Sequence, residues 1–211
     1  MPDIYTNPLF VNLIDASEVN TIIEMGSSNN PSWKTLNEAY SPDEIYAIEA
    51  HPMHEKLLKE QLLEFDNVDF TLIALGKKNC KIDFWLHPDA QSSSVYNHPR
   101  DECELIEIDC ITLSKFCEDK KITKIDLICA DVEGSEAEIF KNQEIMKTVK
   151  YIISEVKLHP EWKGGDFPGF EQLTDAIEPY GFKLAKLIPS GDHAFGDGLW
   201  INENNTGIST K

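Results

Sequence analysis

The sequence predicts an α/β fold, an open and mostly parallel sheet with helices on both of its faces. Strand-like runs alternate with helix-like runs along the chain, which is typical of successive strand–helix–strand units. The run at residues 124–130 (KIDLICA) is almost continuously apolar, as expected of a strand buried on both faces. No repeat and no linker rich in Pro, Gly or Ser divides the 211 residues. We therefore expect one domain over residues 1–211, with residues 1–19 as an N-terminal helical extension.

The expected strands are short β-rich or alternating runs. Those assigned to the main sheet are residues 21–25, 44–49, 68–75, 124–130, 151–156, 182–188 and 199–201. Two further runs, residues 81–86 and 103–109, alternate apolar and polar residues, and we interpret them as added antiparallel strands. Right-handed connections between parallel strands then place the intervening helices on both faces of the sheet.

The expected helices are indicated by apolar spacing and by capping signals. Apolar residues recur at helical spacing in residues 52–65, and residues 112–120 and 170–180 are also expected to be helical. Asn30 is expected to cap a helix that has Pro31 at its first position. Ser135 and the glutamate three residues later have the spacing of a capping box, which predicts another helix start.

Acidic residues strongly outnumber basic ones. The chain has 37 Asp and Glu against 19 Lys and Arg, which gives a formal net charge of −18 at pH 7. Binding to nucleic acid or to anionic membranes rests on Lys and Arg that neutralise phosphates, so neither kind of partner is expected. Hydrophobic residues make up 41% of the chain, which is too many for a disordered acidic segment. No apolar run is long enough to cross a bilayer, so membrane insertion is not expected.

The N-terminus and the cysteines indicate a cytoplasmic protein. Residues 1–4 lack the basic and apolar regions of a signal peptide. The five cysteines form no CxxC pair, and the three that recur every seven residues (Cys103, Cys110 and Cys117) fall on a strand and a helix. We therefore expect reduced thiols and no zinc site built from cysteine.

Ligands of open α/β sheets bind beyond the carboxyl ends of the strands, so the residues that follow each strand are the candidate site. Gly26 follows the first strand as a single glycine, whereas a dinucleotide site needs G-x-G-x-x-G, so a nicotinamide or flavin cofactor is not favoured. Glu24, two residues before Gly26, suits a cationic ligand group. Glu49 ends the second strand, where a carboxylate can accept two hydrogen bonds from a ribose diol. Asp131 and Glu133 follow the fourth strand.

Each of these features also has a purely structural interpretation. Gly26 can belong to an ordinary strand-to-helix turn, and Glu49 can be a solvated residue at a strand end. Acidic residues at the start of a helix complement the helix dipole. That accounts for Glu136 but not for Asp131, because Asp131 lies at the strand end, before the turn.

Two histidines suggest a metal site at first sight. His51 and His54 are three residues apart near an expected helix start, a spacing that helix geometry allows for two ligands. No third ligand is evident nearby in the sequence. We therefore expect a solvated helix end here and no metal.

Together these segments resemble the FkbM family of S-adenosylmethionine-dependent methyltransferases. The strongest resemblance lies in residues 108–140, where the family has a Thr-Leu that opens a helix, followed by I-D-L-x-K-x-D-V-E-G-x-E. This sequence has Thr112-Leu113, Ile125-Asp126-Leu127 and Asp131-Val132-Glu133-Gly134-Ser135-Glu136. Weaker matches lie at residues 22–30, 46–52, 74–76 and 92–96, so the resemblance covers about residues 20–202. The chain departs from the family pattern at Cys129 (usually Lys), Asn30 (usually Gly), Glu24 (usually Asp) and Pro52 (displaced).

The resemblance implies a Rossmann-like class I methyltransferase fold with a seven-stranded sheet, an inserted β-hairpin and S-adenosyl-L-methionine as cofactor. It implies that Gly26 lets the methionine part approach closely, that Glu24 faces its ammonium group and that Glu49 holds the ribose hydroxyls. The residues it assigns to the cofactor are Glu24, Gly26, Ser27, Glu49, Ala74, Ser94, Asp131 and Glu133.

The resemblance also implies methyl transfer to a hydroxyl of a small molecule, a sugar or a glycan. An alcohol needs a base within hydrogen-bond reach as it loses its proton. The candidates, in order, are Asp131, then Glu155 at the end of the fifth strand, then His159 in the Trp-containing loop that follows. The loops expected to face the acceptor, residues 86–100 and 158–170, give no indication of its identity, and the sequence does not indicate an oligomeric state.

Two other functions stay open. The altered first turn and Cys129 are compatible with a non-catalytic module that keeps the fold and the cofactor site. A metal-dependent hydrolase is the other alternative, built on Asp131, Glu133, Glu155 and His159.

Overall fold

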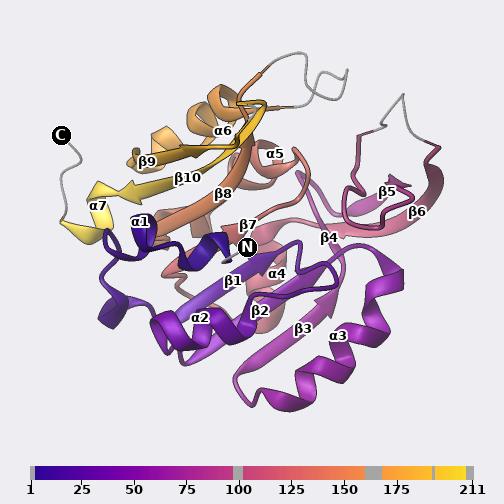
Figure 1. Ribbon diagram of the computed structural model, residues 1–211, viewed down its shortest axis with the longest axis horizontal. Helices are drawn as coiled ribbons and strands as arrows, with labels where there is room; N and C mark the ends of the chain where they lie inside the picture. Colours follow the sequence, from indigo (N-terminus) through magenta and orange to yellow (C-terminus); the bar gives the residue numbers. More distant parts are fainter. Residues whose placement is uncertain (1–2, 97–101, 160–167, 192, 208–211) are drawn as a thin grey trace.

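Seven strands form the central sheet of the computed structural model, which describes residues 3–96, 102–159, 168–191 and 193–207. Their order is β3-β2-β1-β7-β8-β10-β9 (Figure 1). The strands are β1 (Thr21–Met25), β2 (Glu44–Glu49), β3 (Val68–Leu72), β7 (Leu127–Ala130), β8 (Tyr151–Lys157), β9 (Phe182–Pro189) and β10 (Phe195–Asn202). The first five of the order pair in parallel, whereas β10 is antiparallel to β8 and β9. The predicted, mostly parallel sheet is confirmed.

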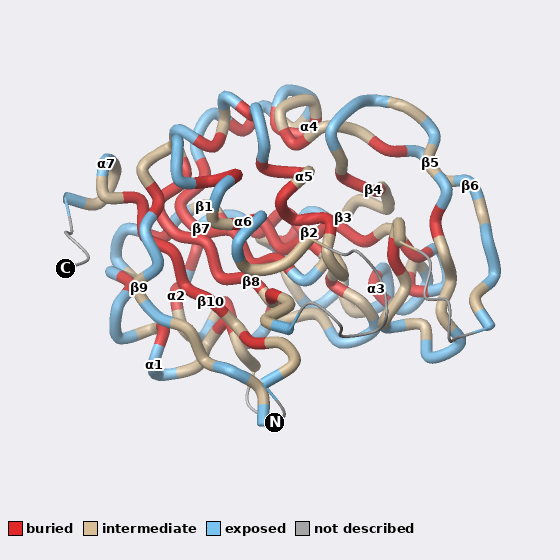
Figure 2. The backbone as a smooth tube through the Cα atoms, turned by 90° about the horizontal axis from the view of Figure 1, so that it is seen from above, coloured by how far each residue is buried: buried red, intermediate tan, exposed pale blue. Residues whose placement is uncertain are grey.

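Helices cover both faces of this sheet, as predicted. They are α1 (Pro8–Val11), α2 (Trp33–Tyr40), α3 (Glu55–Gln61), α4 (Leu113–Lys120), α5 (Glu136–Phe140), α6 (Phe170–Ile177) and α7 (Glu203–Thr206). Successive residues of β1 point to opposite faces. Ile22 lies in one buried cluster with Leu36 of α2, and Ile23 lies in another with Phe116 of α4 and Phe140 of α5. In Figure 2, β1, β7 and β8 form the buried centre between these layers.

A second, smaller sheet corrects one expected strand. Residues 68–75 were expected to be continuous, but the strand ends at Leu72, and β4 (Ala74–Leu75) joins β5 (Cys80–Leu86) and β6 (Glu104–Ile111) in the order β4-β6-β5. The chain leaves the main sheet because its partner β2 ends at Glu49, whose carbonyl accepts the last hydrogen bond from Ile73. The pair β5–β6 is the expected antiparallel insertion.

Two helix starts differ from the prediction. Asn30 does not cap α2, which begins at Trp33, because the carboxylate of Glu24 accepts the Ser32 N–H and holds the turn open. No capping box forms at Ser135, whose hydroxyl donates to the carbonyl of Val132 instead.

Other boundaries differ at strand and helix ends. Residues 124–126 precede β7, because the carboxylate of Asp126 turns aside to accept the N–H groups of Asn20 and Thr21. The helix expected at residues 52–65 is α3 between two single 3-10 turns, and the strand expected at 199–201 is the longer β10. In the part of the chain that the structure describes, no helix is both long and apolar enough to cross a membrane.

Candidate active site

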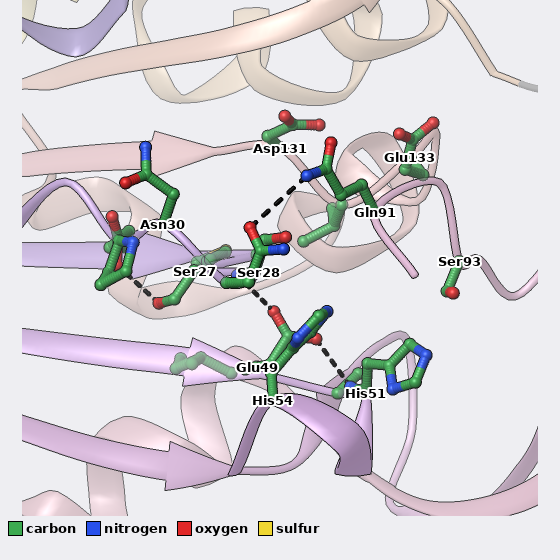
Figure 3. A pocket seen from close by; sticks show the side chains of 18 of the residues that line it. Ser27, Ser28, Asn30, Glu49, His51, His54, Gln91, Ser93, Asp131 and Glu133 are labelled. Atoms are coloured by element: carbon green, nitrogen blue, oxygen red, sulfur yellow. Dashed lines mark hydrogen bonds between the residues drawn. The ribbon is translucent and has the colours of Figure 1, made fainter. Parts of the chain in front are cut away.

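A cavity of about 850 Å³ opens at the carboxyl ends of β1, β2 and β7 (Figure 3). The turn after β1, the end of β2, residues 73–75, residues 90–93 of the hairpin loop and the turn after β7 form most of its walls. Residues 3–5 of the N-terminal segment close one side. Both the size and the position are those of a small-molecule site in an open α/β sheet.

Glu49 is fixed at the wall of this cavity by two backbone donors. Its carboxylate accepts the Ser28 N–H at 2.7 Å and the His51 N–H at 2.6 Å, one on each oxygen (Figure 3). The residue is buried, which excludes the alternative of a solvated residue at a strand end. Each carboxylate oxygen can accept two hydrogen bonds, so both oxygens keep capacity for hydroxyl groups of a ligand.

Gly26 is required by the backbone of the neighbouring strand. Its φ is +84°, and a Cβ at this position would lie 1.8 Å from the carbonyl oxygen of Asp131. The turn after β1 and the turn after β7 are therefore in direct backbone contact at Gly26. A residue with a side chain at this position would prevent that contact. Gly26 also lines the cavity, so the close approach of a ligand that the sequence predicts stays a prediction beside this intramolecular contact.

Glu24 lies beneath the turn and organises it. The side chain is buried and accepts hydrogen bonds from the Ser27 hydroxyl, the Ser32 N–H at 2.7 Å and the Trp33 indole N–H at 2.8 Å. Burial raises the pKa of Glu24, and these three donors act in the opposite direction. Cys129 is its neighbour on β7, and burial keeps the pKa of that thiol high, so neutral donors and no lysine hold the Glu24 carboxylate.

Three carboxylates lie together at the other end of the cavity. Asp131, Glu133 and Glu155 have carboxylate oxygens within 4.8 Å of one another. Asp131 and Glu133 line the cavity, and Glu155 comes from the adjacent strand β8. Burial, and then the charges of Asp131 and Glu133, raise the pKa of Glu155 well above its usual range, and burial raises the pKa of Asp197, opposite it on β10, to about 6. His159 is exposed and lies outside this cluster.

The raised pKa of Glu155 predicts that the protein becomes less stable as the pH rises. The folded state holds a proton on Glu155 above pH 4.5, where the unfolded chain has lost it, so the free energy of unfolding falls as pH rises towards the folded pKa. Glutamine does not titrate, so Glu155→Gln removes the proton that the native protein releases when it unfolds. We expect the variant to gain at least ~1 kcal/mol relative to the native protein between pH 5 and pH 8, since one pKa unit is worth that much. Urea unfolding at both pH values measures it, and Glu171→Gln on exposed α6 surface is the control; equal slopes in all three proteins would contradict the assignment.

The two histidines are buried, which corrects the expectation of a solvated helix end. His51 and His54 are 2% and 4% exposed, and both line the cavity beside Glu49. Their rings are 4.8 Å apart. His54 Nε2 lies 2.8 Å from the carbonyl of Ala90, so it donates and ties the start of α3 to the hairpin loop. Burial, and then the proximity of His54, lower the pKa of His51, which is therefore neutral near pH 7.

The remaining candidate residues divide into two groups. Ala74 and Ser27 are buried and line the cavity. Ser94 is buried behind the wall, where its hydroxyl donates to the carbonyl of Glu133 at 2.8 Å and joins the hairpin loop to the turn after β7. Of the two loops expected to face the acceptor, residues 97–100 and 160–167 fall outside the described part of the chain.

Sequence reasoning missed the N-terminal wall and the two histidines as site residues. His51 follows Glu49 by two residues and therefore had a positional signal. Tyr5 had none, because nothing in residues 3–5 indicates that they pack against strand ends far along the chain.

The family of this chain was identified by comparison with models of known protein families. The Methyltransferase FkbM domain matches residues 37–184 of this chain. The chain belongs to the FkbM methyltransferase family. Among curated proteins, no sequence is significantly similar to it.

Solved structures of methyltransferases have the same fold. An FkbM methyltransferase from Methylobacillus flagellatus KT superposes with a TM-score of 0.61 and 12% identity over 90% of this chain, which spans 45% of that protein. TrmK of M. capricolum, in complex with S-adenosylhomocysteine, gives 0.56 and 12% identity over 96% of this chain and 69% of that one. Fibrillarin of Aeropyrum pernix, with natively bound S-adenosylmethionine, gives 0.54 and 12% identity over 89% and 69%. The fold is therefore the Rossmann-like fold of methyltransferases that the sequence predicted.

Proposed function

We propose that this FkbM family member is an S-adenosylmethionine-dependent O-methyltransferase that acts on a hydroxyl of a small molecule, a sugar or a glycan. The observation that carries the proposal is Glu49, held by two backbone N–H groups at the wall of a cavity whose other end carries Asp131. A fixed carboxylate at the end of the second strand suits a ribose diol. A carboxylate at the end of β7, that of Asp131, can take the proton that an acceptor hydroxyl loses.

The residues present fit S-adenosylmethionine. The cofactor supplies a methyl group on a sulfonium cation, and the acidic walls of the cavity favour a positively charged ligand. Glu49 would hold the ribose, and Ala74 with Ile73 and Leu75 offers an apolar surface for the adenine. Methyl transfer needs mainly alignment of donor and acceptor, which the rigid turns after β1 and β7 provide.

Asp131 is the strongest candidate for the base. A base must be deprotonated before it can accept a proton. Glu155 holds its proton at neutral pH because its pKa is raised, so it ranks second. His159 ranks third, since its side chain is exposed and outside the carboxylate cluster. Glu133 lies beside Asp131 and would help to orient the ligand.

The net charge argues for the class of acceptor. With a formal charge of −18, the chain would repel RNA, so a neutral hydroxyl compound is the better partner. A cytoplasmic location, where the cofactor is made, fits the proposal.

Calorimetry with S-adenosylhomocysteine tests the proposal. We expect the native protein to bind it with a micromolar dissociation constant and to transfer a labelled methyl group to at least one member of a panel of sugars and alcohols. No binding to the native protein would contradict the proposal. Binding without product, over a panel that a related enzyme methylates, would favour the non-catalytic module.

The same preparation tests the hydrolase alternative. Asp131, Glu133 and Glu155 are close enough to share an ion, although His159 does not join them in the described structure. A stoichiometric divalent metal and metal-dependent hydrolysis, with no cofactor binding, would favour that alternative.

A further inference from the structure

The N-terminal segment forms one wall of the cavity. Asp3, Ile4 and Tyr5 line it, although they lie outside residues 37–184, over which the family matches. Tyr40 of α2 donates its hydroxyl to the carbonyl of Tyr5 at 2.9 Å, and Thr35 donates to the carboxylate of Asp3. The second oxygen of Asp3 accepts the N–H of Tyr5 at 3.0 Å. Two hydrogen bonds thus fix the wall to α2, and a third, within the segment, holds its own turn.

The hydroxyl of Tyr5 is the unusual group in this wall. The side chain is 6% exposed, yet its hydroxyl has no hydrogen-bond partner among the residues that the structure describes. Tyr5 lines the cavity, so its hydroxyl is placed to donate to a ligand there. Burial, followed by the charges of Asp131 and Glu24, raises the pKa of Tyr5. The phenol therefore stays protonated and is available as a donor.

The polarity of the cavity tells which part of a ligand reaches Tyr5. In the sheet order β3-β2-β1, Glu49 at the end of β2 lies between residues 73–75, which follow β3, and the turn after β1. The first side is apolar, with Ile73, Ala74, Leu75 and Phe84. A nucleoside whose ribose binds Glu49 therefore places its base on that side. Its 5′ substituent then extends towards β1 and Tyr5.

The charges of Asp131, Glu24 and Asp3 act on Tyr5, so a ligand carboxylate at this end needs a cation beside it. Lys34 is the only lysine or arginine among the described residues that line the cavity, and its exposed ion pair with Glu38 at 4.0 Å is weak. Lys34 lies in the first turn of α2, whose N-terminus has no side-chain cap and so offers free N–H groups. Asp3 nearby is already occupied by two donors.

We propose that the Tyr5 hydroxyl donates a hydrogen bond to the carboxylate of the amino-acid end of S-adenosylmethionine, with Lys34 and the uncapped start of α2 beside it. This assignment rests on the proposed function. It makes the N-terminal segment a specificity element that selects the complete amino-acid group of the cofactor.

Two ligands and two variants test the assignment. Tyr5→Phe removes only the hydroxyl, and decarboxylated S-adenosylhomocysteine lacks only the carboxylate. We expect Tyr5→Phe to weaken binding of S-adenosylhomocysteine roughly 10- to 100-fold, as for loss of a hydrogen bond to a charged group, and to change binding of the decarboxylated ligand less than about twofold. Titration calorimetry of each pair gives the four dissociation constants.

Tyr46→Phe is the matched control, because Tyr46 is a buried tyrosine whose hydroxyl bonds to Glu44 at 2.8 Å, outside the cavity. It should leave both affinities unchanged. An equal effect of Tyr5→Phe on both ligands, or none on either, overturns the assignment while the proposed function stands. No binding of either ligand by the native protein overturns both. Thermal unfolding without ligand shows that the variants are folded.

Discussion

Replacing Glu49 by glutamine should weaken binding of S-adenosylhomocysteine about 100-fold, or ~2.7 kcal/mol. In the native protein both oxygens of Glu49 accept backbone N–H groups, from Ser28 and His51. An amide offers one oxygen and one NH₂, so the NH₂ must face a second donor or turn towards the ligand. Either way the ribose diol loses a charged acceptor, and hydrogen bonds to charged groups are worth about 1.5–3 kcal/mol each.

A control at the other end of the same strand separates this effect from general damage. Glu44 begins β2 and bonds to Tyr46, outside the cavity, so Glu44→Gln should change the affinity less than twofold. A 2′,3′-dideoxy analogue of S-adenosylhomocysteine supplies a second control, because the native protein and Glu49→Gln should bind it about equally. Unchanged affinity of Glu49→Gln for the natural product would show that the ribose lies elsewhere.

The sheet could be predicted because strands that are buried on both faces consist almost entirely of apolar residues. The apolar run that contains β7 identifies a central strand, and β7 does lie between β1 and β8. Residues 68–75 show the limit of this reasoning. Their composition favours a strand throughout, but a strand continues only while it has a partner, and β2 ends at Glu49. The length of the partner strand β2 cannot be inferred from residues 68–75 themselves.

In the site, too, residues placed by their own strand could be predicted, whereas contacts made by residues distant in the sequence could not. Rules about strand ends were sufficient to expect Glu49 and Asp131 in one cavity and Glu155 beside Asp131, because parallel strands end at one edge. The start of α2 could not be predicted, since the side chain of Glu24 reaches forward to the Ser32 N–H. Tyr5 could not be predicted either, because it meets strand ends through tertiary packing, with no pattern in its own segment.

Replacing Gly26 by alanine should be the most destabilising single substitution considered, with a loss of at least about 3 kcal/mol in the free energy of unfolding. A left-handed φ costs a residue with a side chain about 1–3 kcal/mol by itself. Here the new Cβ would also lie 1.8 Å from the carbonyl oxygen of Asp131, so the turns after β1 and β7 would have to separate. That separation moves Asp131 and loosens the contact between two central strands, and urea unfolding of purified protein measures its cost.

Gly207 offers the comparison that isolates the clash. Its φ is +67°, also left-handed, but a Cβ there would meet no atom of the described residues within 4 Å. Gly207→Ala therefore carries the conformational cost alone, about 1–2 kcal/mol. The excess loss in Gly26→Ala measures the contact between the two turns, and similar losses in both variants would contradict it. Because this contact joins the turn that follows Glu24 to the turn that carries Asp131, cofactor affinity should fall in Gly26→Ala at temperatures where the variant is still folded.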